Sequence, residues 1–187
     1  DGWRAVIAED FTFENVRICA AATARHIQGI GDGHKGLVIG YDTRFGSYAF
    51  ALAAAKAAAS QGVSVTLLDK TCPTPVVSFT VVDNGFAGGI VITASHNPPQ
   101  WNGFKFKPSY GGSASTEVVS DIEAHIAGIG DTLGALSAGI DDISIKGLDP
   151  DASYLSHIAT LVDLESIKSS GLRVVVDAMH GSGAGYF

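Results

Sequence analysis

The sequence predicts an α/β protein whose first domain has three layers, α/β/α, built around a mostly parallel, mixed sheet. Short apolar runs alternate with helix-forming segments along the chain, which is typical of α/β folds. Each run is apolar at consecutive positions, as expected of strands that are buried on both faces. The alternation resumes near the end of the chain, where we expect the beginning of a second α/β domain.

The first third of the chain predicts a helix, a strand and a second helix. Thr12 can cap a helix whose apolar positions follow helical spacing, at Val16, Ala20, Ala24 and Ile27. Residues 36–42 ("GLVIGYD") are too few and too apolar for a surface helix, so they predict a strand. Residues 46–62 are alanine-rich and end on a glycine, which predicts the second helix.

The next segment predicts a strand, a helix and another strand. Residues 63–69 ("VSVTLLD") and 87–95 ("AGGIVITAS") are short apolar runs. Residues 76–84, which lie between them, suit a helix or a strand by composition. We predict a helix, because two parallel strands need a crossover connection.

The last third of the chain contains two further helical segments. Residues 115–130 begin with hydroxyl residues and an early acid, which predicts a capped helix. Residues 130–151 are rich in Gly, Ser and Asp and indicate a linker, with room for one edge strand around "DDISIKG" (141–147). A helix at 154–171 and a strand at 172–177 follow.

These elements divide the chain into three parts. We expect a first domain at 1–135, a linker at 136–153 and the incomplete start of a second domain at 154–187. The chain does not begin with Met, and it ends just after a strand and a glycine-rich turn. Both ends suggest a part of a longer polypeptide.

The composition excludes several classes of partner. The 187 residues are 46% hydrophobic and 17% charged, and no apolar run approaches the roughly 20 residues that span a bilayer. The net charge of −7 argues against nucleic acid and anionic membranes, which are normally bound by excess Lys and Arg. The first residues, "DGWRAVIAED", lack the basic segment and apolar run expected of a signal peptide. Cys19 and Cys72 are expected to be buried free thiols, which suits a cytoplasmic location.

Polar loops follow all three strands of the predicted sheet. In open α/β sheets, ligands bind beyond the carboxyl ends of the strands, and those ends lie together when the strands are parallel. We therefore expect one cleft faced by the polar side chains of these loops: Asp42, Arg44, Thr71, Ser95, His96 and Lys105.

The loop "TASHNPP" holds the candidate nucleophile. Ser95 is expected to be exposed at the end of a rigid strand, although many serines in such loops only cap or turn the chain. His96 could assist it, but neighbouring side chains diverge in extended backbone. The Asn97-Pro-Pro sequence is expected to stiffen the loop. We interpret Asn102-Gly103 as a turn that brings Lys105 back toward Ser95.

Several cations surround the serine in sequence. Lys105 and Lys107 lie two residues apart, so they share one side of an extended segment, with Phe104 and Phe106 on the other side. Arginines at 4 and 44 add planar hydrogen-bond donors that suit phosphate oxygens. A hydroxyl with several cations favours phosphoryl transfer, which depends on positioning and charge neutralisation.

Three other interpretations stay open. A serine hydrolase would normally show G-x-S-x-G, and "TASHN" lacks both glycines. The segment "HGSGAG" is not the G-x-G-x-x-G motif of dinucleotide-binding proteins. A non-catalytic α/β binding module is the third alternative.

The motif "TASHNPPQWNGFK" closely resembles the phosphoserine loop of the α-D-phosphohexomutases, the family of phosphoglucomutases and phosphomannomutases. "DGWR" resembles the end of that family's N-terminal signature, "GYDTR" its first-strand motif, and "VVVDAMHGSGAGYF" the opening of its second domain. The resemblance covers the whole chain in the family's order. It implies domain I and the start of domain II.

The resemblance implies a reaction and a role for each matching residue. Such enzymes interconvert hexose 1-phosphate and hexose 6-phosphate, of glucose or mannose, through a phosphoserine and a bound 1,6-bisphosphate. Glucose 1,6-bisphosphate then acts as activator. Ser95 would carry the phosphoryl group, and the residues matching catalytic positions are His96, Lys105, which would help with proton transfer, and Arg4. The phosphate-binding or substrate-binding positions would be Arg44, Asn97 and Lys107.

The resemblance also implies parts that this sequence lacks. The family binds Mg²⁺ through a phosphate oxygen on the serine, here Ser95, and through three aspartates of a D-G-D-x-D-R loop, which is absent from the sequence. The family's sugar-reading and phosphate-clamping loops are absent too. Ala94 stands where many members have Gly. We therefore expect the partners to be a hexose phosphate and the remaining domains of the same polypeptide, and we expect the chain alone to be inactive.

Overall fold

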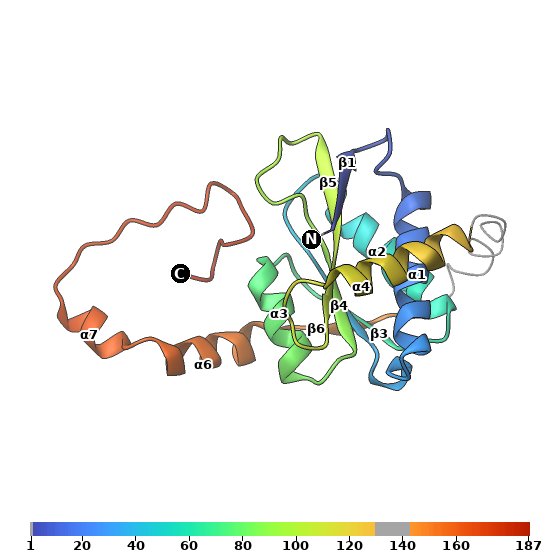
Figure 1. Ribbon diagram of the computed structural model, residues 1–187. Coiled ribbons are helices and arrows are strands. Elements are labelled where there is room, and N and C mark those ends of the chain that lie inside the picture. The colour runs from blue at the N-terminus through green and yellow to red at the C-terminus, as the bar shows by residue number, and fades with distance from the viewer. Residues whose placement is uncertain (1, 130–142) are drawn as a thin grey trace.

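The structure is a computed structural model that describes residues 2–129 and 143–187. Its centre is a six-stranded sheet with the order β1-β5-β4-β2-β3-β6, and helices cover both faces (Figure 1). The predicted three-layer α/β fold with a mixed sheet is confirmed.

The parallel part of the sheet is built from the three predicted strands. β2 (Leu37–Tyr41) lies between β3 (Val65–Leu68) and β4 (Gly88–Ile92) and is parallel to both. β6 (Lys146–Leu148) joins the far side of β3, also in parallel, within the region where an edge strand was predicted. The carboxyl ends of β2 and β4 therefore lie side by side.

The other edge of the sheet is antiparallel. β5 (Trp101–Pro108) runs antiparallel to β4, and β1 (Trp3–Val6) pairs with β5. The interpretation of Asn102-Gly103 as a turn is wrong, because both residues lie inside β5. The chain reverses earlier, where the Trp101 amide donates to the carbonyl of Pro98 at 3.0 Å.

The helices up to residue 129 follow the predicted order. α1 (Phe13–Gly29) is capped by the Thr12 hydroxyl, which accepts from the Asn15 amide at 3.2 Å. A 3₁₀ turn η1, with bounds Gly33–Lys35, leads into β2. The next helix, α2, comprises Ser47–Ser60, and α3 comprises Thr74–Asp83, which settles the ambiguous segment as a helix. α4 comprises Thr116–Ala127.

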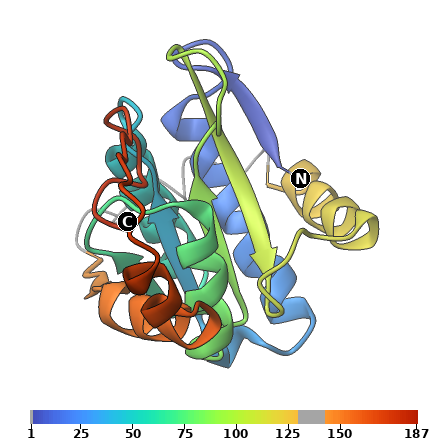
Figure 2. The same cartoon turned by 90° about the vertical axis from the view of Figure 1, so that its left-hand side faces the viewer.

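Two apolar cores lie on opposite faces of the sheet. The larger core packs α1 and α2 against side chains such as Ile39, Ile90 and Ile92. The smaller core packs α3 against Val38 and Val91, which point the other way from the same strands. Figure 1 shows the sheet nearly on edge between these helical layers, and Figure 2 looks onto the face of the sheet that α3 covers. Alternate residues of β2 and β4 are thus buried on both sides, which explains their continuous apolar sequence.

The C-terminal segment differs from the prediction in two ways. The helix predicted at 154–171 is two helices, α6 (Asp151–Leu161) and α7 (Leu164–Ser169), because Val162 is extended and the Asp163 side chain caps α7 through the Ser166 amide at 2.9 Å.

The strand predicted at 172–177 is not formed. Its central residue, Val175, is 94% exposed. A strand needs a partner for its backbone hydrogen bonds, and no other described strand pairs with these residues.

Polar contacts connect the C-terminal segment to the rest of the fold. Lys70, just after β3, lies 3.0 Å from the Asp149 carboxylate and 2.7 Å from that of Asp151. The Tyr186 hydroxyl donates to Asp151 at 2.7 Å. The C-terminal end thus folds back toward the sheet, as Figures 1 and 2 show.

Both cysteines are free, as predicted. Cys72 is buried and Cys19 partly so, and burial raises the pKa of Cys72 to about 12 and that of Cys19 to about 11. Among the described helices, none has the length and apolarity needed to cross a membrane.

Candidate active site at the carboxyl ends of β2 and β4

The site lies where the chain leaves two neighbouring parallel strands. α2 follows β2 and packs on one face of the sheet, whereas α3, which precedes β4, packs on the other face. Ligands of open α/β sheets bind in the crevice outside the carboxyl ends of such strands. Residues 42–46 follow β2, and residues 93–101, which we call the serine loop, follow β4.

Ser95 has an unusual backbone conformation within the serine loop. Its φ angle is +57°, a left-handed conformation that is unfavourable for residues with a side chain and costs on the order of 1 kcal/mol. The Ser95 amide donates to the Thr93 hydroxyl at 2.9 Å, and the Asn97 amide donates to the Ala94 carbonyl at 3.1 Å. The Ser95 residue is exposed, so this tight turn presents its hydroxyl to solvent.

Arg44 reaches from the β2 loop into the serine loop. Its side chain is 14% exposed, and its Nε lies 3.4 Å from the Asp42 carboxylate. The two terminal nitrogens donate to four backbone carbonyls of the serine loop: those of Ser95 at 2.8 Å, Asn97 at 2.6 Å, Pro98 at 3.0 Å and Trp101 at 3.0 Å.

A buried polar network lies beneath Arg44. The Asp42 carboxylate accepts from the Ser47 hydroxyl at 2.7 Å and from the Arg44 amide at 3.0 Å. The Ser47 hydroxyl accepts from the Asn102 side chain at 2.9 Å, and Asn102 in turn accepts from the Gly103 amide at 2.8 Å. Asn102 is fully buried, so this network joins the β2 loop, the start of α2 and the start of β5.

An open cleft of about 470 Å³ lies over these residues. Its walls come from the β2 loop, the serine loop and the turn at 181–182 in the C-terminal segment: Asp42, Thr43, Arg44, Phe45, Ser95, Asn97, Pro99, Gly181 and Ser182. A second cavity of about 160 Å³ lies between α1, α4 and β5 and is lined mainly by apolar groups. The first cleft is the candidate site, because Ser95, the candidate nucleophile, lines it.

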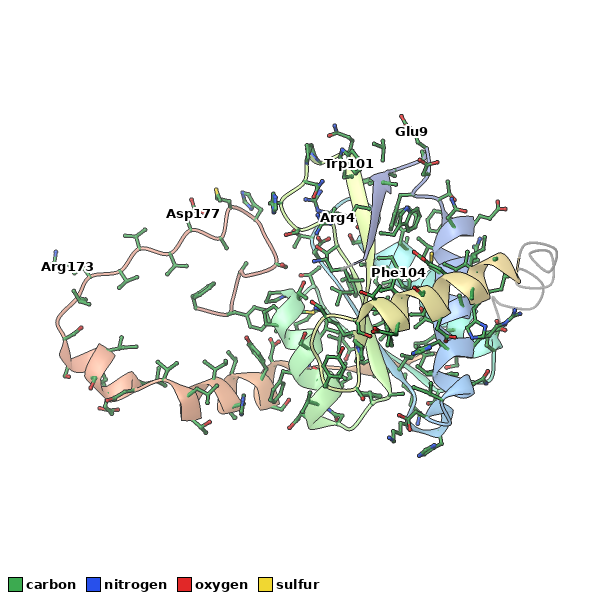
Figure 3. All side chains as sticks on the ribbon, in the orientation of Figure 1. Arg4, Glu9, Trp101, Phe104, Arg173 and Asp177 are labelled. Carbon is green, nitrogen blue, oxygen red and sulfur yellow. The ribbon has the colours of Figure 1, made fainter. Side chains whose placement is uncertain are left out.

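A row of cations lies on the face of β1 and β5 opposite the α1 core. Phe104 and Phe106 pack into that core, so Lys105 and Lys107 alternate to the other face, as predicted. Figure 3 shows Arg4 on the side of the sheet that faces the C-terminal segment, and Phe104 toward the helices on the opposite side. Arg4 also donates to the Asn97 side chain at 3.5 Å. The row of cations is therefore in contact with the serine loop.

The pKa of Lys105 is lowered. Partial burial is the main cause, and the positive charges of Arg4 and Lys107 add to it. Each of these effects disfavours the charged ammonium. Lys105 is therefore more easily deprotonated than an ordinary surface lysine.

Three of the six residues expected at one cleft line it in the structure. Asp42, Arg44 and Ser95 line it, and the His96 Nδ1 lies 3.4 Å from the Ser95 hydroxyl. His96, Thr71 and Lys105 are not among the lining residues. Thr71 follows β3, on the far side of β2 from the serine loop.

The buried network contains two residues that the sequence did not predict at the site, Ser47 and Asn102. Ser47 read as part of an alanine-rich helix, and Asn102 read as a turn residue before Gly103. Gly103 is needed for close packing, since a Cβ there would lie 2.5 Å from the Thr93 carbonyl. The sequence offers one indication of their role: each is a polar residue at the start of a mainly apolar segment, Ser47 in α2 and Asn102 in β5.

The described residues do not fit a Mg²⁺ site by themselves. No group of three or more His, Cys, Asp or Glu side chains within 2–129 and 143–187 is placed to hold a metal ion. In the lining of the cleft, the one carboxylate is Asp42, and it is already engaged by Arg44 and Ser47. No chemical step is therefore assigned to a metal.

Comparison with known proteins places this geometry in a family. A family model described as phosphoglucomutase/phosphomannomutase, alpha/beta/alpha domain I, matches residues 1–132. A phosphoglucomutase of Komagataeibacter xylinus is 30% identical over 183 residues, covering 86% of this chain and 32% of that protein. A phosphoglucosamine mutase of Corynebacterium jeikeium is 32% identical over 185 residues, covering 97% of this chain and 40% of that protein. The chain thus spans less than half the length of these relatives.

Solved structures agree with the sequence comparison. A Thermus thermophilus protein described as a phosphomannomutase superposes with a TM-score of 0.85 at 37% identity, over 100% of this chain and 40% of that one. The Paramecium phosphoglucomutase parafusin shares the fold, with a TM-score of 0.80 over 99% of this chain and 39% of that one at 20% identity. The chain belongs to the phosphoglucomutase/phosphomannomutase family, whose first α/β/α domain its residues 1–132 match.

Proposed function

We propose that this chain is the N-terminal part of a phosphohexomutase and supplies the serine that carries the transferred phosphoryl group. The observation that supports this most is Ser95 itself: an exposed residue, held at a φ of +57° at the end of β4, in a cleft that Asp42 and Arg44 also line. A nucleophile on a strained turn that directly follows a rigid strand is held in one orientation.

The proposed reaction exchanges one phosphate ester for another. In the first transfer, the bond between the Ser95 oxygen and phosphorus breaks, and phosphorus bonds to a hydroxyl oxygen of a hexose monophosphate. The proton of that hydroxyl ends on the serine oxygen, and a 1,6-bisphosphate results. After the bisphosphate turns over, the reverse transfer returns the other phosphoryl group to Ser95. Binding and orientation supply most of the catalysis in such transfers.

Lys105 is the proposed carrier of the proton. A lysine can accept a proton only in its neutral form, and the lowered pKa of Lys105 makes that form more accessible. Arg4 and Lys107 contribute positive charge that would offset the charge of the phosphoryl group. His96, 3.4 Å from the Ser95 hydroxyl, and Asn97 are proposed to support the serine loop and its hydrogen bonds.

The substrate is proposed only as a class. The relatives named above act, by their names, on glucose and glucosamine phosphates, so a hexose phosphate is the shared feature. Mg²⁺ and glucose 1,6-bisphosphate stay part of the proposal, with Ser95 contributing its phosphate oxygen to the metal. The remaining metal ligands would come from other domains of the same polypeptide. The two free thiols are compatible with a cytoplasmic location.

Protein mass spectrometry can test this proposal against a binding module that has the fold without the chemistry. Full-length protein containing this chain is dephosphorylated and incubated with glucose 1,6-bisphosphate and Mg²⁺. We expect the wild-type protein and Ser64→Ala, a change at an exposed serine before β3, to gain one phosphoryl group, and Ser95→Ala to gain none. Equal uptake by the Ser95 variant, or no uptake by the wild type, would contradict the proposal.

A further inference from the structure

The contacts of Arg44 identify a role that differs from phosphate binding. A guanidinium has five N–H donors and no acceptor. In Arg44 the four terminal N–H groups can be matched to the four carbonyls of the serine loop, and Nε faces Asp42. A phosphate could bind to this guanidinium only by displacing bonds to the protein.

The serine loop has few other ways to fix its shape. Pro98 and Pro99 lack backbone N–H groups, so the loop cannot form a regular hydrogen-bond ladder. Its own backbone bonds are two short turns, from Asn97 to Ala94 and from Trp101 to Pro98, at 3.1 and 3.0 Å. A further bond, from the Ile7 amide to the Gln100 carbonyl at 2.8 Å, holds its tip. Arg44 therefore makes more hydrogen bonds to the backbone of the serine loop, four, than the loop's backbone makes within itself.

One of the four carbonyls belongs to Ser95. The bond from Arg44 to this oxygen, at 2.8 Å, fixes the peptide unit that leaves Ser95. It can thereby offset part of the cost of the left-handed φ, since hydrogen bonds to charged donors are stronger than those between neutral groups. The direction of the Ser95 hydroxyl is coupled to this peptide plane.

Arg44 is itself held by the network beneath it. Asp42 contacts both the backbone amide and Nε of Arg44, at 3.0 and 3.4 Å. Asp42 and Ser47 are buried, and their 2.7 Å hydrogen bond attaches the network to the first turn of α2. A side chain anchored in this way can hold the loop without moving itself.

We propose that Arg44 is a positioning residue: it acts through the serine loop, by holding Ser95 in its left-handed conformation, and not as a phosphate ligand. This inference rests on the proposed function for its catalytic consequence. Its structural part, the order of the serine loop, is independent of any reaction. A replacement that keeps the positive charge but loses the planar donors should therefore be nearly as damaging as complete removal.

Hydrogen exchange tests the structural part in the 187-residue chain. Arg44→Lys keeps the charge at one nitrogen, which cannot reach four carbonyls at once. We expect amide exchange of residues 95–101 to accelerate at least tenfold, whereas exchange in α1 stays unchanged. The matched control is Arg25→Lys, because Arg25 bonds only to the Gln61 side chain, at 3.0 Å, among the contacts described for it. Unchanged exchange in the loop would overturn the proposal. Should Arg44→Lys fail to fold, Arg44→Gln, with two donors, is measured in its place.

Kinetics test the catalytic part in the full-length protein. A displaced reacting group can lower the rate about 100-fold, so we expect Arg44→Lys to lower kcat by that order while KM changes less than about threefold. A phosphate ligand would give the opposite split, with KM raised and kcat largely kept, and that result would overturn the positioning role. If the wild-type protein shows no phosphoryl transfer, the proposed function fails, and the exchange experiment still decides whether Arg44 orders the loop.

Discussion

Two stretches of this chain have similar sequences but different structures. Residues 88–97 and residues 172–182 are each an apolar run followed by a short polar turn, and both turns contribute to the same cleft. The first run is β4, buried on both faces and paired on both edges. The second is unpaired, and its Val175 is 94% exposed.

The turns at the ends of these two stretches show the same contrast. Both contain left-handed residues with side chains: Ser95 at +57° in the first, and Met179 and His180 at +47° and +59° in the second. Ser95 is held by a side chain from another element, Arg44, at 2.8 Å. The second turn is closed by local bonds, such as that from Gly181 to the Ala178 carbonyl at 2.7 Å. Tertiary partners, rather than the local pattern, distinguish the turn that holds Ser95, the proposed nucleophile, from the turn at 178–181.

Removal of one cleft hydroxyl from each stretch should give the largest difference between them. Ser95→Ala in the full-length protein is expected to lower mutase turnover at least about 1,000-fold, because a covalent carrier has no substitute. Ser182→Ala removes the hydroxyl from the opposite wall and should leave turnover within about tenfold of wild type. A coupled assay of hexose phosphate interconversion measures both. Comparable losses in the two variants would show that the contrast has no functional meaning.

Lysines that flank the two stretches, Lys105 in β5 and Lys168 in α7, should differ next in their effect on turnover. We expect Lys105→Met to lower turnover about 10- to 100-fold, as is typical when a proton carrier is removed, with little change in melting temperature. Lys168→Met in α7 is the matched control and should leave turnover unchanged. A loss of stability in Lys105→Met without a matching loss of turnover would favour a structural lysine.

The lowered pKa of Lys105 gives this lysine a pH signature. Between its lowered pKa in the folded state and the ordinary value of about 10.4, the unfolded chain binds more protons at this site. Stability contributed by Lys105 therefore rises as pH increases through that window and is absent below it. Denaturant titrations of wild type and Lys105→Met across this alkaline window should diverge in that direction, and a divergence of opposite sign would contradict the burial of Lys105.

The same substitution in each apolar run should differ in its effect on stability. Val91→Ala removes two methyl groups from the α3 core, where Val91 is 1% exposed, and should lower the free energy of unfolding by about 2 kcal/mol. Val175→Ala should change it by less than about 0.5 kcal/mol, as at other exposed positions. Urea denaturation of the 187-residue chain gives both values. Similar losses would mean that residues 172–177 are packed after all.

The smallest expected effect concerns the attachment of the C-terminal segment. Lys70→Met removes the ion pairs to Asp149 and Asp151. Exposed ion pairs contribute little to stability, so the melting temperature should stay the same. Trypsin cleavage after Arg173 should nevertheless become faster, since the segment loses a point of attachment. Unaltered cleavage would assign the attachment to Tyr186 and α6 instead.

The sequence predicted well what depends on repeated local pattern. Alternating helices and apolar runs predicted the three parallel strands and the layers around them. Parallel strand ends then placed Asp42, Arg44 and Ser95 together, because this follows from topology without any side-chain geometry.

What could not be predicted depends on long-range pairing. β1 is only four residues long and contains an arginine, so its strand character comes from pairing with β5. The Asn102-Gly103 pair has the composition of a turn, but burial and the bond to Ser47 place it in a strand. The run at 172–177 has strand composition and no partner among the described strands.

In the function proposed above, Ser95 stores a phosphoryl group and passes it to a hexose phosphate. The most direct test is a chase experiment on full-length protein that carries radiolabelled phosphate. Excess glucose 1-phosphate is added, and the label is followed by rapid quenching and peptide mapping. Our expectation is that label leaves the peptide containing Ser95 and enters hexose 1,6-bisphosphate within the time of one turnover. Label that stays on Ser95, or leaves only as inorganic phosphate, would contradict it.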